Sequence, residues 1–170
     1  KWLPDHFLEI SRKRIDELKK LCRFLALVHD LGKLTPVFAA RITETIPEVR
    51  LRLESVGLWI GSSKEYHDEN KAPHARAGEV ILLDMGCPHG IAAIVGAHHG
   101  KPQDTMLHWR DELGAYHFNY YGNSNDGTWD NLRQKWCAIA LEEAGYTEIS
   151  ELPEIQQPVQ VLLTGLLIMA

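Results

Sequence analysis

The chain contains 170 residues, of which 45% are hydrophobic and 24% are charged, as is ordinary for a globular protein. This length is sufficient for one domain with a substantial hydrophobic core. The net charge of −5 excludes a global basic field of the kind that binds nucleic acid, although metal ions in a site would add local positive charge that this count ignores.

The cysteine content indicates a reducing compartment. Cys22, Cys87 and Cys137 lie far apart and form no CxxC pair, so we expect free, buried thiols and a cytoplasmic protein. No signal-peptide pattern opens the chain, and its longest apolar run, 159–170, is too short and too interrupted to span a membrane. Both ends of the sequence are abrupt, which predicts a fragment of a longer polypeptide, truncated at each end.

The first predicted helix covers about residues 12–31 and becomes fully buried towards its end. Its apolar residues recur at spacings of three and four: Ile15, Leu18, Leu21, Cys22, Leu25 and Val28. Gly32 and Pro36 indicate where this helix stops. His29 and Asp30 stand side by side at that end, where burying them unpaired would be costly. Both are ligand types for divalent transition metals, and simple capping of the helix end is the alternative.

Two further short helices are predicted next, at 36–45 and at about 49–56. The first begins at Pro36, and its apolar side consists of Val37, Phe38 and Ile42. The stretch 57–72 is polar and is expected to be an exposed connection. It contains a second His-Asp pair, at 67–68, which no apolar helix precedes, so we interpret that pair as part of a solvated loop.

The middle of the chain repeats the arrangement of the first helix. A helix is predicted over 74–85, with His74 in its first turn and Gly86 at its end. Another begins at Pro88 and ends in His98-His99-Gly100. Adjacent helical residues point about 100° apart, so both histidines reach one site only near a helix end, as here.

The segment 101–128 is predicted to be a long irregular loop. Its aromatic side chains are expected to pack beneath the loop, with stacking on bases as the alternative: Trp109, Tyr116, Phe118, Tyr120 and Tyr121. We expect His108 and His117 not to be ligands. A helix at 129–144 follows, with Leu132, Trp136, Ile139 and Ala140 facing inward, and a last helix begins at Val159. No strand alternation is convincing, so the fold class is all-α.

Five side chains with metal-ligating atoms share one predicted location, the ends of buried helices. They are His29, Asp30, His74, His98 and His99. Together they can bind one ion fully, or two ions with Asp30 as the bridge. Two such ions hydrolyse phosphate esters by activating water and by stabilising the charged oxygens.

The motifs "VHDLGK" followed by "TPVF", then "APHARAG" and "GAHHGKP", resemble the HD phosphohydrolase superfamily. More narrowly, they resemble the HD nuclease domain of the CRISPR-associated helicase–nuclease of type I systems. The similarity covers most of the chain, from "WLP" to "LLTGLLIMA". A generic HD protein would share His29-Asp30 but not the "GAHHGKP" block.

The resemblance implies a single HD-type nuclease domain over residues 1–170, an all-α HD-domain helical bundle that cuts single-stranded DNA in CRISPR interference. In that family the equivalents of all five side chains named above are metal ligands. Asp30 and Lys33 would be catalytic: Asp30 bridges the ions and Lys33 holds the scissile phosphate. The cofactor would be one or two divalent transition-metal ions, with Mn, Fe, Co, Ni and Zn equally acceptable. The implied partners are a helicase domain in the same polypeptide and the RNA-guided CRISPR surveillance complex.

Two features of the family have no match in this sequence. One is an earlier histidine ligand on a helix before "KWLP", for which His6 lies too close to the first motif. The other is an aspartate directly after the last helix. The ligands of one ion are present, namely His74, His98, His99 and Asp30. We therefore expect one ion to bind well and the other poorly.

The same ligands suit two other functions. One is an HD phosphohydrolase that acts on nucleotides or cyclic nucleotides; a closed pocket would favour it, whereas an open groove would favour a DNA strand. The other is a non-catalytic, metal-holding regulatory HD domain. His98-His99 and Lys33 argue against the regulatory domain, because a purely structural site needs neither an open position nor a phosphate-facing lysine.

Overall fold

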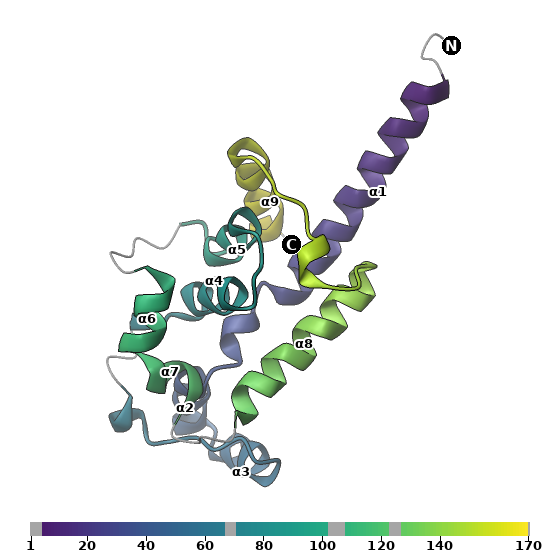
Figure 1. Cartoon of the computed structure of the whole chain (residues 1–170). Coiled ribbons are helices and arrows are strands. Elements are labelled where there is room, and N and C mark those ends of the chain that lie inside the picture. The colour runs from purple at the N-terminus through teal and green to yellow at the C-terminus, as the bar shows by residue number, and fades with distance from the viewer. Residues whose placement is uncertain (1–4, 67–70, 102–107, 123–126, 170) are drawn as a thin grey trace.

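The computed structural model describes residues 5–66, 71–101, 108–122 and 127–169, with side chains from Arg14 onward except that of Ser63. Within these ranges every regular element is a helix, which confirms the all-α prediction (Figure 1). The α-helices are α1 (Asp5–Val28), α2 (Pro36–Thr45), α3 (Pro47–Ser55), α4 (His74–Asp84), α5 (His89–Gly96), α6 (Trp109–Ala115), α7 (His117–Tyr121), α8 (Thr128–Ala144) and α9 (Gln157–Met169). The 3₁₀ turns are η1 (Leu31–Lys33), η2 (Ser63–Glu65) and η4 (Ile149–Glu151).

Proline and glycine place most of the helix ends, as predicted. Pro36 and Pro47 occupy the first residue of α2 and α3, where a missing backbone N–H costs nothing. Gly86 and Gly145 follow the ends of α4 and α8 with φ angles of +85° and +86°, which side chains of L-residues rarely adopt. None of the described helices is long and apolar enough to cross a membrane.

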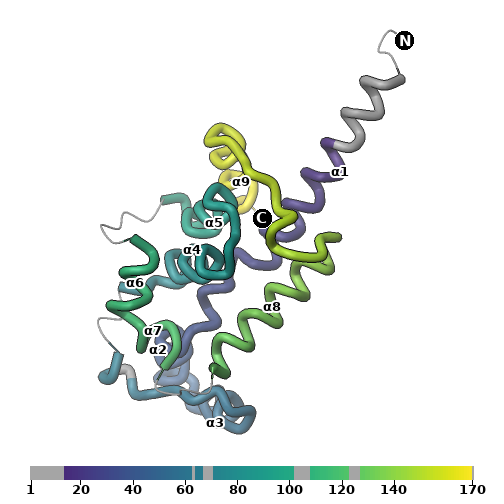
Figure 2. Tube along the Cα trace, in the orientation of Figure 1, coloured from purple at the N-terminus to yellow at the C-terminus, as the bar shows by residue number. Residues whose placement is uncertain are grey.

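The hydrophobic core lies between the C-terminal half of α1, α4 and α5, with α8 packed along α1 (Figures 1 and 2). Phe24 and Val28 of α1 are fully buried against this core, as are Val80 and Leu82 of α4 and Ile91 of α5. Burial of each such side chain contributes about 1.5–3 kcal/mol. The ends of α1, α4 and α5 that carry the predicted ligands therefore adjoin the buried core.

Several side chains predicted to face the core are exposed instead. Ile15 and Leu18 are 51% and 45% exposed, because the N-terminal part of α1 extends beyond the helices that cover its end (Figure 1). Trp136 and Ile139 of α8 are 42% and 51% exposed, and Ile42 of α2 is 38% exposed. Trp136 nevertheless contacts α1, since its indole N–H donates to the Leu27 carbonyl at 2.9 Å. Periodicity identifies an apolar stripe but not the neighbour that covers it.

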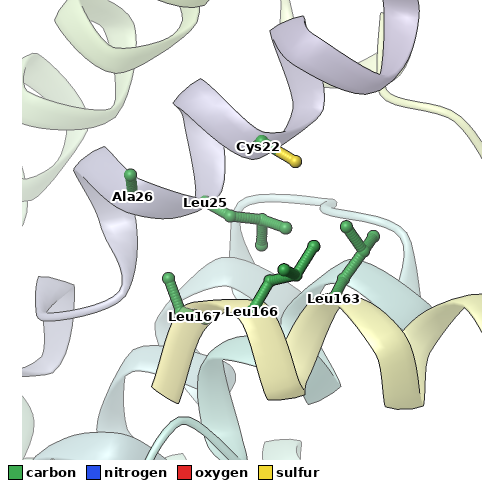
Figure 3. Close-up of a pocket in the computed structure, with 6 residues that line it drawn as sticks. All are labelled: Cys22, Leu25, Ala26, Leu163, Leu166 and Leu167. Carbon is green, nitrogen blue, oxygen red and sulfur yellow. The ribbon is translucent and has the colours of Figure 1, made fainter. Parts of the chain in front are cut away.

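The packing of α9 against α1 is incomplete. A cavity of about 280 Å³ lies between the two helices and is lined by Cys22, Leu25, Ala26, Leu163, Leu166 and Leu167 (Figure 3). Of these side chains, Leu25 and Leu163 are buried, whereas Leu166 is 53% exposed. Among the described residues of α9, Leu163 is therefore the one that is buried, and the other apolar side chains of this helix are partly or largely exposed.

The prediction of an irregular loop over 101–128 is wrong for the residues that the structure describes. They form α6 and α7, while 102–107 and 123–126 lie outside the described residues. The aromatic side chains pack inward, as expected: Tyr120 is fully buried and the other four contact the core. Helices as short as α6 and α7 are not stable in isolation, so tertiary contacts must stabilise them here.

A buried polar network attaches α6 and α7 to α4. The Arg76 guanidinium donates to Glu112 at 2.8 Å, and the Tyr120 hydroxyl donates to the other oxygen of Glu112 at 2.6 Å. Arg76 also pairs with Glu79 at 2.9 Å. Glu112 is only 2% exposed, so its charge depends on these partners. Arg133 of α8 is likewise buried and donates to the Tyr120 carbonyl at 2.6 Å.

Gly32 allows η1 to lie directly on the backbone of α4. A Cβ at this position would overlap the His74 carbonyl oxygen and would stand 2.5 Å from the Gly78 amide nitrogen. Gly32 does not have a positive φ angle, so its role is close approach rather than helix termination. This contact sets the distance between the end of α1 and the start of α4.

Replacing Glu112 tests the buried network. We expect Glu112→Ala to lower the free energy of unfolding by about 3–5 kcal/mol, because it leaves the Arg76 charge buried with one carboxylate fewer. Asp111→Ala removes an exposed carboxylate from the same helix and should change it by less than about 0.5 kcal/mol. Urea denaturation measures both values. Equal effects of the two substitutions would show that the network is not a stabilising element.

Replacing Gly32 tests the close approach. Gly32→Ala should cost about 3 kcal/mol or more, because the added methyl group meets backbone atoms that cannot move aside easily. Gly114→Ala is the matched control, since a Cβ there meets nothing within 4 Å and sits in a helix. The control should be neutral or stabilising by up to about 1 kcal/mol. The midpoint of thermal unfolding measures the stability of both variants. An unchanged midpoint for Gly32→Ala would show that η1 and α4 do not approach each other as closely as described.

Candidate metal centre

The first two candidate ligands lie at the turn between α1 and η1. His29 still donates its backbone N–H to Leu25 at 2.9 Å, and Asp30 precedes the 3₁₀ turn. The His29 and Asp30 side chains are 38% and 35% exposed, and their nearest polar atoms are 3.2 Å apart. Lys33 Nζ donates to the same carboxylate at 2.8 Å. The end of the buried helix thus presents an imidazole, a carboxylate and a cation on one partly solvated surface.

The third candidate ligand comes from the first turn of α4. Pro73 precedes His74, and the contact between Gly32 and Gly78 brings this turn against η1. His74 Nε2 lies 3.6 Å from Asp30 Oδ1 as a result. The ring of Phe38, from α2, packs edge-on against the His74 ring, with centroids 5.5 Å apart.

The last two candidate ligands follow α5, in the turn after its cap residue Ala97. Gly100 closes this turn with a φ angle of +85°. His98 Nε2 lies 3.7 Å from Asp30 Oδ1, and His99 Nε2 lies 2.7 Å from His74 Nε2. The two adjacent histidines therefore turn towards the same cluster, as their position at a helix end allows.

Backbone carbonyls orient two of the imidazoles. Nδ1 of His29 donates to the Ala26 carbonyl at 2.8 Å, and Nδ1 of His98 donates to the Val95 carbonyl at 2.6 Å. This leaves the Nε2 lone pair of each ring directed at the cluster, the arrangement that metal-ligating histidines use.

The unmatched donors in this cluster fit a metal ion. His98 Nε2 is buried and has no hydrogen-bond partner among the described residues. The ligand atoms of His74, His98 and His99 all lie within 4.8 Å of one another. An unpaired buried nitrogen is costly, and the Nε2 atoms of His74 and His99, 2.7 Å apart, must share one proton to avoid repelling each other. A divalent cation among them removes both costs, and nitrogen with carboxylate oxygen is a donor set that transition metals accept.

The local electrostatics keep the donors in the forms that bind metal. Burial, together with the neighbouring His99 and His98, lowers the pKa of His74 to about 4. Burial also lowers the pKa of His98. Burial alone would raise the pKa of Asp30, but the hydrogen bond from Lys33 and the charge of His29 outweigh it and lower that pKa. At neutral pH His74 and His98 are therefore neutral, and Asp30 is ionised.

The other histidines have different surroundings. His108 accepts a hydrogen bond from the Arg110 amide at the start of α6, and the His117 ring packs on Tyr121 with centroids 4.7 Å apart. The pair at 67–68 lies outside the described residues, as does the side chain of His6. Sequence reasoning missed Arg76 and Glu112; a signal was present, because Arg76 stands among apolar residues of the predicted helix.

A groove borders the cluster on the side of α2. It has a volume of about 500 Å³, is open to solvent, and is lined by Phe38, Arg41, Ile42, Thr45, Ile46 and His74. His74 thus belongs both to the ligand cluster and to the wall of the groove. Any molecule lying in the groove reaches the candidate metal centre.

Comparison with known proteins identifies relatives of this chain. The family model described as "Cas3, HD domain" matches residues 1–170. The CRISPR-associated nuclease/helicase Cas3 of Streptococcus thermophilus is 33% identical over 180 residues, which cover 100% of this chain and 19% of that protein. The chain thus spans about a fifth of the length of this relative. No solved structure matches the chain.

The family model matches the whole chain, and the alignment with the Streptococcus thermophilus relative also covers all of it. The described residues are all-α, and the motifs of the sequence meet in one cluster of histidines around Asp30. This chain belongs to the family of Cas3 HD domains.

Proposed function

We propose that this domain is a metal-dependent nuclease that hydrolyses the phosphodiester bonds of single-stranded DNA in CRISPR interference. The observation that carries the proposal is the convergence of His74, His98 and His99 on the Asp30 carboxylate, beside an open groove. Membership of the Cas3 HD family supports it, as does the relative from Streptococcus thermophilus, which is a nuclease/helicase.

The ligand set in this proposal is His29, Asp30, His74, His98 and His99, holding one or two divalent ions. Such ions act as Lewis acids and make water a nucleophile at neutral pH. The protein contributes fixed donors, because carbonyls orient His29 and His98 while the packing of α4 on η1 places His74. Asp30 lies among the imidazoles, and its two oxygens face different histidines, which suits a bridging ligand.

Lys33 is the proposed phosphate-binding residue. Its ammonium group contacts Asp30 Oδ2 and is 43% exposed, so it borders the cluster and still faces solvent. A phosphodiester at the centre would bring negative oxygens to this cation, and a fixed positive charge there stabilises the charge that develops during hydrolysis. Asp30 holds the lysine in place by the same ion pair.

The open groove favours a strand over a free nucleotide. Enzymes that bind small ligands enclose most of the ligand surface, whereas a groove on the molecular surface leaves room for the chain to continue on both sides. In the proposed system, a helicase in the same polypeptide and an RNA-guided surveillance complex would supply the strand. Sequence selectivity would come from base pairing with the guide. The unpaired Cys22, Cys87 and Cys137 suit the reducing cytoplasm.

Removing one ligand tests the metal site directly. We expect His98→Ala to weaken the binding of Mn²⁺ to the metal-stripped protein by at least about 100-fold, since even residues outside the ligand set change metal affinity by about 10–100-fold. His117→Ala removes an exposed imidazole that packs on Tyr121 and should bind Mn²⁺ like the wild type. Isothermal titration calorimetry measures both affinities. Unchanged binding by His98→Ala would exclude it from the ligand set.

Hydrolysis assays test the activity and separate it from its rivals. The metal-stripped protein receives Mn, Co, Ni or Zn and is offered single-stranded DNA and a panel of nucleotides. We expect DNA cleavage that Asp30→Ala and Lys33→Ala each lower by at least about 100-fold, because each removes a charge at the reacting phosphate.

Asp16→Ala and Lys19→Ala are the matched controls for that assay. They break an exposed pair at 3.5 Å with the same sequence spacing, on the far part of α1, and should leave cleavage unchanged. Turnover of nucleotides without DNA cleavage would support the phosphohydrolase. Bound metal without any hydrolysis would support the regulatory domain.

A further inference from the structure

The groove beside the candidate metal centre is formed by one face of α2. Phe38, Arg41, Ile42, Thr45 and Ile46 line it, and their spacings of three and four residues place them along one side of the helix. This explains the exposure of Ile42 and Ile46, which are 38% and 48% exposed. Of the apolar side that the sequence predicts for this helix, Val37 is buried, whereas Phe38 and Ile42 line a groove that is open to solvent.

Phe38 stands where the groove meets the cluster. Its ring packs edge-on against the His74 ring, so its orientation is held from the side of the metal centre. The ring is only half-buried and lines the groove. A fixed aromatic ring on an open wall offers a stacking partner for a nucleic-acid base, and such stacking tolerates any base sequence.

Arg41 brings a guanidinium group to the wall of the groove and also keeps a contact within the protein. Among the described residues that line it, Arg41 is the side chain that is charged at every physiological pH, and it lies one helical turn beyond Phe38. Guanidinium groups bind phosphate oxygens with two parallel hydrogen bonds. This local cation matters in a chain whose net charge is −5, because the molecule as a whole does not attract DNA.

We propose that the α2 face is the binding track for the strand next to the scissile phosphate, with Phe38 stacking on the adjacent base and Arg41 binding a neighbouring phosphate. The ligand is single-stranded nucleic acid bound without sequence preference. This inference rests on the proposed nuclease function, since the cluster at His74 is then where the strand is cut. Ile42 and Ile46 contribute apolar surface for the sugar and base edges, and Thr45 contributes a hydroxyl.

Equilibrium binding tests the track without any catalysis. Fluorescence anisotropy with a labelled oligothymidylate, in the presence of a chelator, measures affinity over a range of salt concentrations. We expect Phe38→Leu to weaken binding by at least about fivefold, because an alkyl side chain of similar size cannot stack. Arg41→Ala should weaken binding and lower the slope of log affinity against log salt by about 0.7, the value for one phosphate contact on a single strand.

Arg52→Ala, on the exposed surface of α3, is the matched control for the loss of one arginine charge. It should bind the oligonucleotide with the affinity and salt slope of the wild type. If Phe38→Leu and Arg41→Ala both bind like Arg52→Ala, the α2 face is not the track and the inference is wrong. Thermal unfolding of each variant confirms that it is folded at the assay temperature.

A small diester separates this inference from the proposed function. Bis(p-nitrophenyl) phosphate reaches the metal centre but has no chain to lie in the groove. With Mn²⁺ added, we expect Phe38→Leu and Arg41→Ala to lose at least about fivefold more kcat/KM on single-stranded DNA than on the small diester. Equal losses on both substrates would mean that the two residues act only by supporting His74, which overturns the track. Absence of hydrolysis of either substrate by the wild type would instead overturn the nuclease function.

Discussion

The contact between η1 and the backbone of α4 is the constraint on which the candidate site depends. Gly32 lies so close to His74 and Gly78 that no side chain fits between the two segments. Asp30 precedes this contact by two residues, and His74 begins the helix on its other side, so the packing itself sets their 3.6 Å separation. Because α5 packs on α4 in turn, the end of α5 brings His98 to the same carboxylate.

The arrangement brings three imidazoles close together, two of them beside the Asp30 carboxylate. His98 Nε2 is buried without a partner among the described residues, and burial with neighbouring rings lowers the pKa of His74 to about 4. A site of this kind is costly to maintain in the empty protein, and the rigid packing of α1, α4 and α5 sustains it. That rigidity also keeps the donors from moving apart, which preserves their affinity for a cation.

The outer helices depend on buried polar groups more than on apolar ones. Glu112 connects α6 and α7 to α4 through Arg76 and Tyr120, and Arg133 connects α8 to the carbonyl of Tyr120. Buried charges of this kind add specificity of position, since each accepts few partner geometries. The face of α2 beside His74 lines a groove that is open to solvent. A substrate in this groove would lie next to the histidine cluster.

The sequence alone determined most of the helices and the types of candidate ligand, because these depend on local properties. Helical periodicity with Pro36, Pro47, Gly86 and Gly145 predicts the helices closely, and the order of the three histidine-containing motifs indicates the family. Only the tertiary structure decided which apolar stripes are covered, that 101–128 holds two helices, and that Arg76 meets Glu112. It also showed that Gly32 serves a close approach and that Phe38 and Arg41 line an open groove. These features depend on contacts between residues far apart in the chain, which a local pattern does not encode.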